Sequence, residues 1–127
     1  MAIITTFWIL LITLVVLLSP LLIGSAVMGW QKSIKVRHKD SGINKNIFIG
    51  YSWTYFFFGF FVPIFRGEVS IGFFHLLLSI LTFGVFQLVM PFIYNKQFSH
   101  RQLVAGWNLD DSELSNALAR EKLNIST

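Results

Sequence analysis

Residues 50–65 read GYSWTYFFFGFFVPIF, and this stretch decides how the rest of the chain is interpreted. It contains nine aromatic residues and is interrupted by Gly59 and Pro63. As one helix, its 16 residues would extend about 24 Å, less than the ~30 Å hydrocarbon core of a bilayer. The segment therefore either crosses a membrane with help from residues 47–49 or lies as a re-entrant or interfacial helix.

The composition places the chain in a membrane. Its 127 residues are 54% hydrophobic and only 13% charged, whereas soluble domains carry roughly a quarter charged residues. A chain of this length buries only about two-thirds of its unfolded surface, so the excess apolar surface must meet lipid or a partner. We therefore predict an all-α integral membrane protein whose main partner is the lipid bilayer.

Two long apolar runs, residues 3–28 and 69–94, are each long enough to cross a bilayer. At ~1.5 Å per residue each would extend about 39 Å as a helix. The first run could instead be a cleaved signal peptide, because Gly24-Ser25-Ala26 offers small residues for cleavage. Its length and the lack of a basic start favour an uncleaved anchor, assigned to residues 1–30.

Basic residues flank the apolar runs and set the expected orientation. One group lies in residues 31–49 and another follows residue 94, as Lys96, His100 and Arg101. Positively charged flanks favour the cytoplasm, so we expect a multi-pass inner-membrane protein with three spans, the N-terminus outside and the tail cytoplasmic. A re-entrant segment at residues 50–65 would instead place the tail outside.

The two polar segments carry weaker signals. In residues 31–49, alternating residues around Asp40-Ser41-Gly42 are compatible with a small β-hairpin, although a structureless basic loop fits as well. In the tail, residues 95–127, Asp110 or Asp111 could cap an amphipathic helix whose apolar stripe is Leu114, Ala117 and Leu118. We expect that stripe to rest on the membrane or on a partner.

A seam of small and polar residues is predicted to close a helical hairpin formed by residues 50–94. One face carries Ser52, Tyr55 and Gly59, and the other carries Gly72, His75, Ser79 and Thr82. If the turn centres on Gly67, Gly59 lies opposite His75, Tyr55 opposite Ser79, and Ser52 opposite Thr82. Arg66, Gly67 and Glu68 then form the hairpin tip, where Arg66 and Glu68 could pair.

The sequence contains no recognisable catalytic, metal-binding or phosphate-binding motif. The chain has no cysteine, its three histidines are scattered between loop, helix and tail, and no glycine-rich phosphate loop or Gly-x-Ser-x-Gly motif is present. The basic residues form no separate nucleic-acid-binding domain. We therefore expect a non-enzymatic protein with no cofactor, no metal, no nucleic-acid partner and no small-molecule substrate.

The run GYSWTYFFFGFFVPIFRGE, followed by TFG at residues 82–84 and LVMPFIYNK at residues 88–96, resembles the HrgC-like family of small bacterial and phage membrane proteins. The resemblance covers about residues 34–107. Glu68 replaces the family's usual Asp, and Val69-Ser70 replaces Trp-Lys. The residues that carry the family-like motif are Gly50, Ser52, Trp53, Thr54, Pro63, Tyr94, Asn95 and Lys96.

The resemblance implies a bacterial or phage origin and an inner-membrane location, but no activity. The leading hypothesis is an accessory or interaction protein that acts through helix packing with a membrane-protein partner or with its own copies. The alternative is an immunity or superinfection-exclusion protein of a phage or plasmid.

Overall fold

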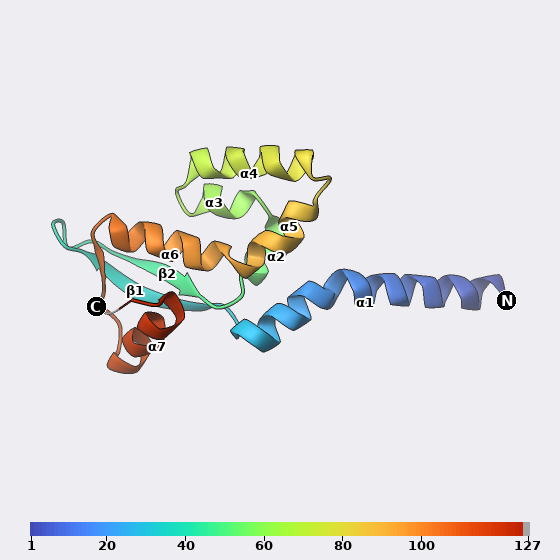
Figure 1. Cartoon of the computed structure of the whole chain (residues 1–127), viewed down its shortest axis with the longest axis horizontal. Helices are drawn as coiled ribbons and strands as arrows, with labels where there is room; N and C mark the ends of the chain where they lie inside the picture. Colours follow the sequence, from blue (N-terminus) through green and yellow to red (C-terminus); the bar gives the residue numbers. More distant parts are fainter. Residues whose placement is uncertain (126–127) are drawn as a thin grey trace.

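The computed structural model describes residues 1–125, which form one long helix and a compact body (Figure 1). The long helix, α1 (Ala2–Met28), leaves nearly all of its apolar side chains exposed. Among the described residues, it is the one helix that is long and apolar enough to cross a membrane by itself. A signal sequence meets the same criteria, so both interpretations of this segment stand.

A small antiparallel sheet follows α1 and corrects the all-α prediction. Strands β1 (Lys32–His38) and β2 (Asn44–Ile49) form a hairpin, and β3 (Trp107–Leu109) pairs with the other edge of β1. Alternate side chains of β1 and β2, such as Ile34 and Ile47, are fully buried, as expected for a sheet with one covered face. The β-hairpin interpretation of residues 31–49 is therefore correct, and β3 was not predicted.

The aromatic segment forms two short helices in place of one. Helix α2 (Trp53–Phe58) ends at Gly59, and α3 (Phe61–Phe65) follows at once. Gly59 has a φ of +59°, a left-handed conformation that few residues other than glycine adopt readily. The chain therefore breaks at Gly59 and does not build a helix long enough to cross a bilayer.

The second apolar run is also broken, so the predicted continuous helix over residues 69–94 is wrong. It forms α4 (Val69–Leu81), α5 (Val85–Val89) and the 3₁₀ helix η1 (Met90–Phe92). Phe83 and Gly84 both have positive φ angles, and the chain bends by 117° between α4 and the α5–η1 segment. The structure thus does not support the multi-pass arrangement.

The last two helices pack on the sheet. Helix α6 (Tyr94–Val104) lies along β2, and α7 (Glu113–Leu123) contacts β1 and β2. The core contains residues from both helices and both strands, including Phe98 and Leu123. In Figure 1 the body is layered, with α4 outside α3, followed by α6 and the sheet.

The tail helix was predicted, but the side that it buries was not. Helix α7 buries Ser115, Ala119 and Leu123, whereas Leu114 is 79% exposed. Its N-cap is Ser112, which accepts a hydrogen bond from the Ser115 backbone N–H, and not Asp110 or Asp111. Asp111 instead accepts a hydrogen bond from the Lys35 backbone N–H, because α7 is held against the sheet.

Candidate functional site

A group of polar side chains joins the aromatic helices to α6 and to the end of α1. We call this group the polar cluster, and it consists of Gln31, Arg66, Glu68, Tyr94, Asn95 and Arg101. Its members come from the α1–β1 linker, the α3–α4 turn and α6. The α3–α4 turn is the segment predicted to be the hairpin tip.

Arg66 is held by neutral partners. Its guanidinium donates to Asn95 Oδ1 at 2.9 Å and to Gln31 Oε1 at 3.2 Å. The guanidinium also lies 4.0 Å from the centre of the Phe48 ring, a cation–π arrangement. Burial lowers the pKa of Arg66 to about 10, so the side chain remains charged at neutral pH.

Glu68 binds the second arginine of the cluster. Arg101 donates to both carboxylate oxygens of Glu68, at 2.6 and 2.9 Å, and the Tyr94 hydroxyl donates to the same carboxylate at 2.8 Å. The Glu68 side chain is only 10% exposed. The hydrogen bonds with Glu68 raise the pKa of Arg101. The expected pairing of Arg66 with Glu68 is therefore replaced by two separate sets of bonds.

Gln31 and Asn95 tie the cluster to the backbone. Gln31 Oε1 accepts from Thr54, Arg66 and Asn95, and Asn95 also donates to the Gly50 carbonyl at 3.2 Å. Sequence reasoning named Asn95 and Gly50 only through the family resemblance and missed Gln31 and the role of Arg101. A lone Gln after an apolar run carries no periodic signal that could have identified it.

Two residues named for the predicted seam, Tyr55 and His75, meet in the structure, but not as one of the predicted pairs. The Tyr55 hydroxyl and His75 Nδ1 are 2.9 Å apart and both side chains are buried. Gly59 lies against Gln87, whose side chain would be 2.9 Å from an added Cβ, and Gly72 lies against Ile64. The predicted register fails because it assumed two continuous helices, whereas the chain breaks at Gly59 and after Leu81.

The other predicted residues have mainly local roles. Ser52 caps α2, Thr82 bonds the Leu78 carbonyl and the Phe86 N–H, and Ser79 Oγ has no hydrogen-bond partner among the described residues. Pro63 is buried in α3 and Lys96 is exposed on α6. Trp53 packs edge-on against Phe57, and Gly67 is exposed in the turn.

The Tyr55–His75 bond can be tested with a matched pair of tyrosines. Replacing Tyr55 by Phe leaves a buried imidazole nitrogen unpaired, so we expect a loss of about 1 to 2 kcal/mol in unfolding free energy. Tyr51 is also fully buried, but its hydroxyl has no hydrogen-bond partner among the described residues. Tyr51→Phe should therefore be neutral or slightly stabilising, and equal losses for the two variants would contradict this assignment. Thermal unfolding in mild detergent provides the measurement.

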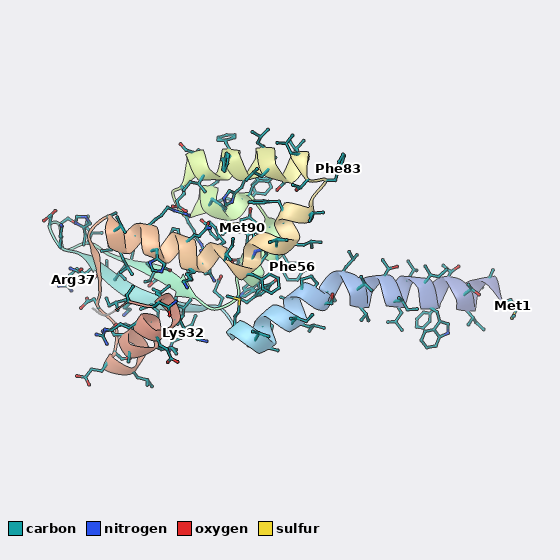
Figure 2. All side chains as sticks on the ribbon, viewed as in Figure 1. Met1, Lys32, Arg37, Phe56, Phe83 and Met90 are labelled. Carbon is teal, nitrogen blue, oxygen red and sulfur yellow. The ribbon has the colours of Figure 1, made fainter. Side chains whose placement is uncertain are left out.

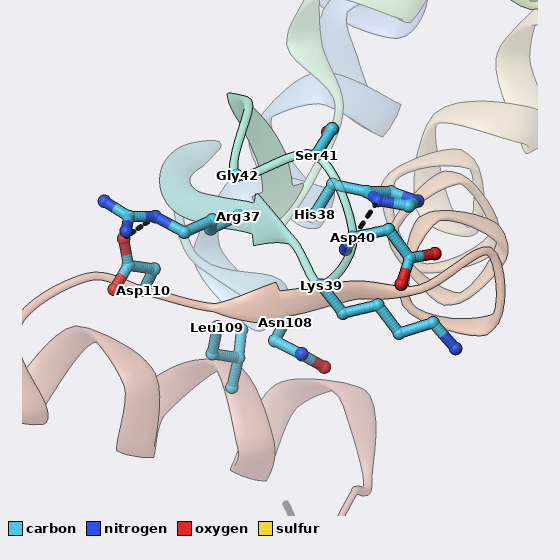
Figure 3. A pocket seen from close by; sticks show the side chains of 9 residues that line it. All are labelled: Arg37, His38, Lys39, Asp40, Ser41, Gly42, Asn108, Leu109 and Asp110. Carbon is cyan, nitrogen blue, oxygen red and sulfur yellow. Dashed lines mark hydrogen bonds and ion pairs between the residues drawn. The ribbon is translucent and has the colours of Figure 1, made fainter.

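A second polar site lies at the end of the β1–β2 hairpin, in an open pocket of about 470 Å³ (Figure 3). Arg37 and Asp110 face one another there at 3.4 Å, with side chains 57% and 49% exposed. An exposed ion pair of this kind contributes only about 0 to 1 kcal/mol to the stability of the fold. Within residues 1–125, no group of three or more His, Asp or Glu side chains is placed to hold a metal ion. We therefore regard the polar cluster as the stronger candidate site.

In comparisons with known proteins, no protein-family model, curated protein or solved structure matches this chain. The structure is that of a mostly helical protein with one apolar N-terminal helix and a small three-stranded sheet. Membership of the HrgC-like family stays a prediction.

Proposed function

We propose that this chain is a small, non-enzymatic interaction protein of a bacterial inner membrane. In this account α1 crosses the bilayer, and α2 to η1 enter it and return to the side from which they came. The sheet, α6 and α7 form a cytoplasmic layer. The protein acts by packing the outer face of α4 against a membrane-protein partner or a second copy of itself.

The observation that carries the proposal is the apolar surface of residues 53–93. This segment contains only two charged residues, Arg66 and Glu68, and both belong to the polar cluster. A monomeric soluble protein rarely exposes a contiguous apolar patch of more than a few hundred Å². Figure 2 shows side chains projecting outward from α4. The large apolar side chains exposed in this segment are Trp53, Phe57, Phe58, Phe61, Phe65, Val69, Phe73, Phe74, Leu77, Ile80, Leu81, Phe83, Val85, Leu88, Val89 and Ile93.

The polar cluster supports an arrangement in which α2 to η1 enter and leave the membrane on the same side. A hairpin of two crossings would separate Arg66 from Asn95 by roughly the ~30 Å thickness of the hydrocarbon core. Their side chains are instead joined by a 2.9 Å hydrogen bond, and Arg66 also reaches Gln31, just after α1. In this account all three polar segments share one side of the membrane. This account keeps both basic flanks in the cytoplasm, which the positive-inside rule favours, without requiring three spans.

The outer face of α4 is the surface proposed to meet a partner. Phe73, Phe74 and Leu77 are each more than half exposed, whereas Gly72 and His75 on the other side are buried against α3 and α2. Aromatic residues supply large contact areas and are enriched where proteins pack together.

Photo-crosslinking in cells tests this function. A photoreactive amino acid at Phe74 should give a protein adduct of discrete mass, either a partner or a second copy of the chain. Leu10 on α1 is 64% exposed and Phe74 is 58% exposed, so Leu10 is the matched control and should give lipid adducts. Lipid adducts alone at both Phe73 and Phe74 would contradict a role in protein interaction.

A further inference from the structure

An apolar pocket of about 380 Å³ lies beside Arg66, which contributes to its lining. Its walls are formed by Phe48 of β2, Phe58 of α2, and Val62 and Phe65 of α3. Arg66, Gln31 and Thr54 complete its lining. The volume is within the range of about 300 to 1,000 Å³ of pockets that hold small-molecule ligands.

Arg66 brings a positive charge to this pocket that no carboxylate neutralises directly. Among the described residues, the ion pairs are Arg37 with Asp110 and Arg101 with Glu68. Glu68 is near enough to favour the charge of Arg66, but its two oxygens are already bonded to Arg101 and Tyr94. A guanidinium has five N–H donors, and among the described residues the partners of Arg66 are Asn95, Gln31 and Tyr94, none of them a carboxylate.

The guanidinium is also held in place for a ligand. It lies 4.0 Å from the centre of the Phe48 ring and 5.0 Å from that of Phe98, which together with its two hydrogen bonds restricts its rotation. A fixed planar fork of donors is suited to bidentate binding of a phosphate group. Trp30, next to Gln31, is 66% exposed, as is typical of a residue at the membrane–water interface.

We propose that this pocket binds an anionic phospholipid, with the phosphate on Arg66 and one acyl chain between Phe48, Phe58 and Phe65. Phe58 and Phe65 are 56% and 80% exposed, so the apolar walls continue to the surface that faces lipid in the proposed function. The inference rests on that function only for the depth of the pocket in the bilayer. It does not depend on the chain having a protein partner.

Lipid binding to the full chain in a neutral detergent tests the proposal. Phosphatidylglycerol and phosphatidylcholine with identical acyl chains are titrated separately, and bound lipid is counted by native mass spectrometry. Both lipids carry the phosphate, but the quaternary ammonium of phosphatidylcholine neutralises its charge and is repelled by Arg66, so phosphatidylglycerol should bind about tenfold more tightly or better. Equal affinity for the two lipids would overturn the proposal. Displacement of the lipid by equimolar inorganic phosphate would show a free-phosphate site and would overturn it too.

Two neighbouring phenylalanines provide a matched pair of variants. Phe57 and Phe58 are exposed to a similar extent on α2, 53% and 56%, but only Phe58 lines the pocket. Phe58→Glu places a carboxylate in the pocket that Arg66 also lines and should abolish the preference for phosphatidylglycerol, whereas Phe57→Glu should retain it. Arg66→Gln should also abolish it. Unchanged preference in Phe58→Glu would contradict the site, whatever the result of the crosslinking at Phe74.

Discussion

Replacing Glu68 by Gln should lower the free energy of unfolding by about 2 to 3 kcal/mol. The carboxylate of Glu68 accepts two bonds from Arg101 and one from Tyr94, and its side chain is only 10% exposed. Glutamine keeps the shape but loses the negative charge, so Arg101 loses its ion-pair partner. Because Arg101 is 35% exposed, water compensates for part of this loss, and the expected effect is below that of a fully buried pair. Thermal unfolding of the full chain in mild detergent measures it.

Glu121→Gln is the control for this prediction. Glu121 lies on α7, is exposed, and forms no ion pair among the described residues. Surface substitutions of this kind usually change stability by no more than about 0.5 kcal/mol. If the Glu68 and Glu121 variants melted at the same temperature, the polar cluster would not hold the aromatic helices on α6.

Gly50→Ala is expected to lower the free energy of unfolding by about 3 kcal/mol or more. Gly50 has a φ of +86°, and an added Cβ would lie 2.6 Å from the Trp30 carbonyl oxygen and 2.9 Å from that of Gly29. Both contacts are with backbone atoms, which cannot move aside as a flexible side chain could. The variant should therefore loosen the junction of α1 with the body, seen as a lower melting temperature and faster proteolysis after α1.

Gly67→Ala is the control, because it introduces the backbone strain of a positive φ without the close contact that an added Cβ makes at Gly50. Gly67 has a φ of +88°, but nothing lies within 4 Å of an added Cβ. Its substitution should lower the free energy of unfolding only by the ~1 to 2 kcal/mol that an alanine loses in the left-handed backbone conformation. Losses of the same size at Gly50 and Gly67 would mean that the carbonyl groups of Gly29 and Trp30 do not approach Gly50 as the structure shows.

Local patterns in the sequence were sufficient to predict several elements. The alternation around Asp40-Ser41-Gly42 indicated the hairpin of β1 and β2, and the apolar run of residues 3–28 indicated a long helix. The tail helix followed from its polar N-terminal residues and its spacing of apolar residues. Each of these signals depends on neighbours in the chain, which is why the sequence alone could reveal it.

The breaks in the apolar helices were harder to predict. Gly59 and Gly84 adopt positive φ angles, but glycine occurs inside many membrane helices, so neither residue alone indicates a break. The run of apolar residues also continues across Thr82 to Gly84 without a charge. Length and hydropathy therefore predicted a single spanning helix where the structure has a bend.

The contacts of the polar cluster could not be derived from sequence because they join distant segments. Arg66 bonds with Gln31 and Asn95, which are 35 and 29 residues away in the chain. Treating Arg66 and Glu68 as a hairpin tip placed them far from both residues. The strand β3 could not be predicted for the same reason, because its three residues pair with β1, which lies about 70 residues earlier in the chain.

Cysteine labelling in intact cells tests the central claim, that the α3–α4 turn and the sheet lie on the same side of the membrane. The chain has no cysteine, so single cysteines at Ala2, Ser41 and Ser70, all exposed, report on three segments without background. An impermeant maleimide should label Ala2→Cys in intact cells, and both Ser41→Cys and Ser70→Cys only after lysis. Labelling of Ser70→Cys together with Ala2→Cys, with Ser41→Cys protected, would contradict the account and restore the arrangement with three spans.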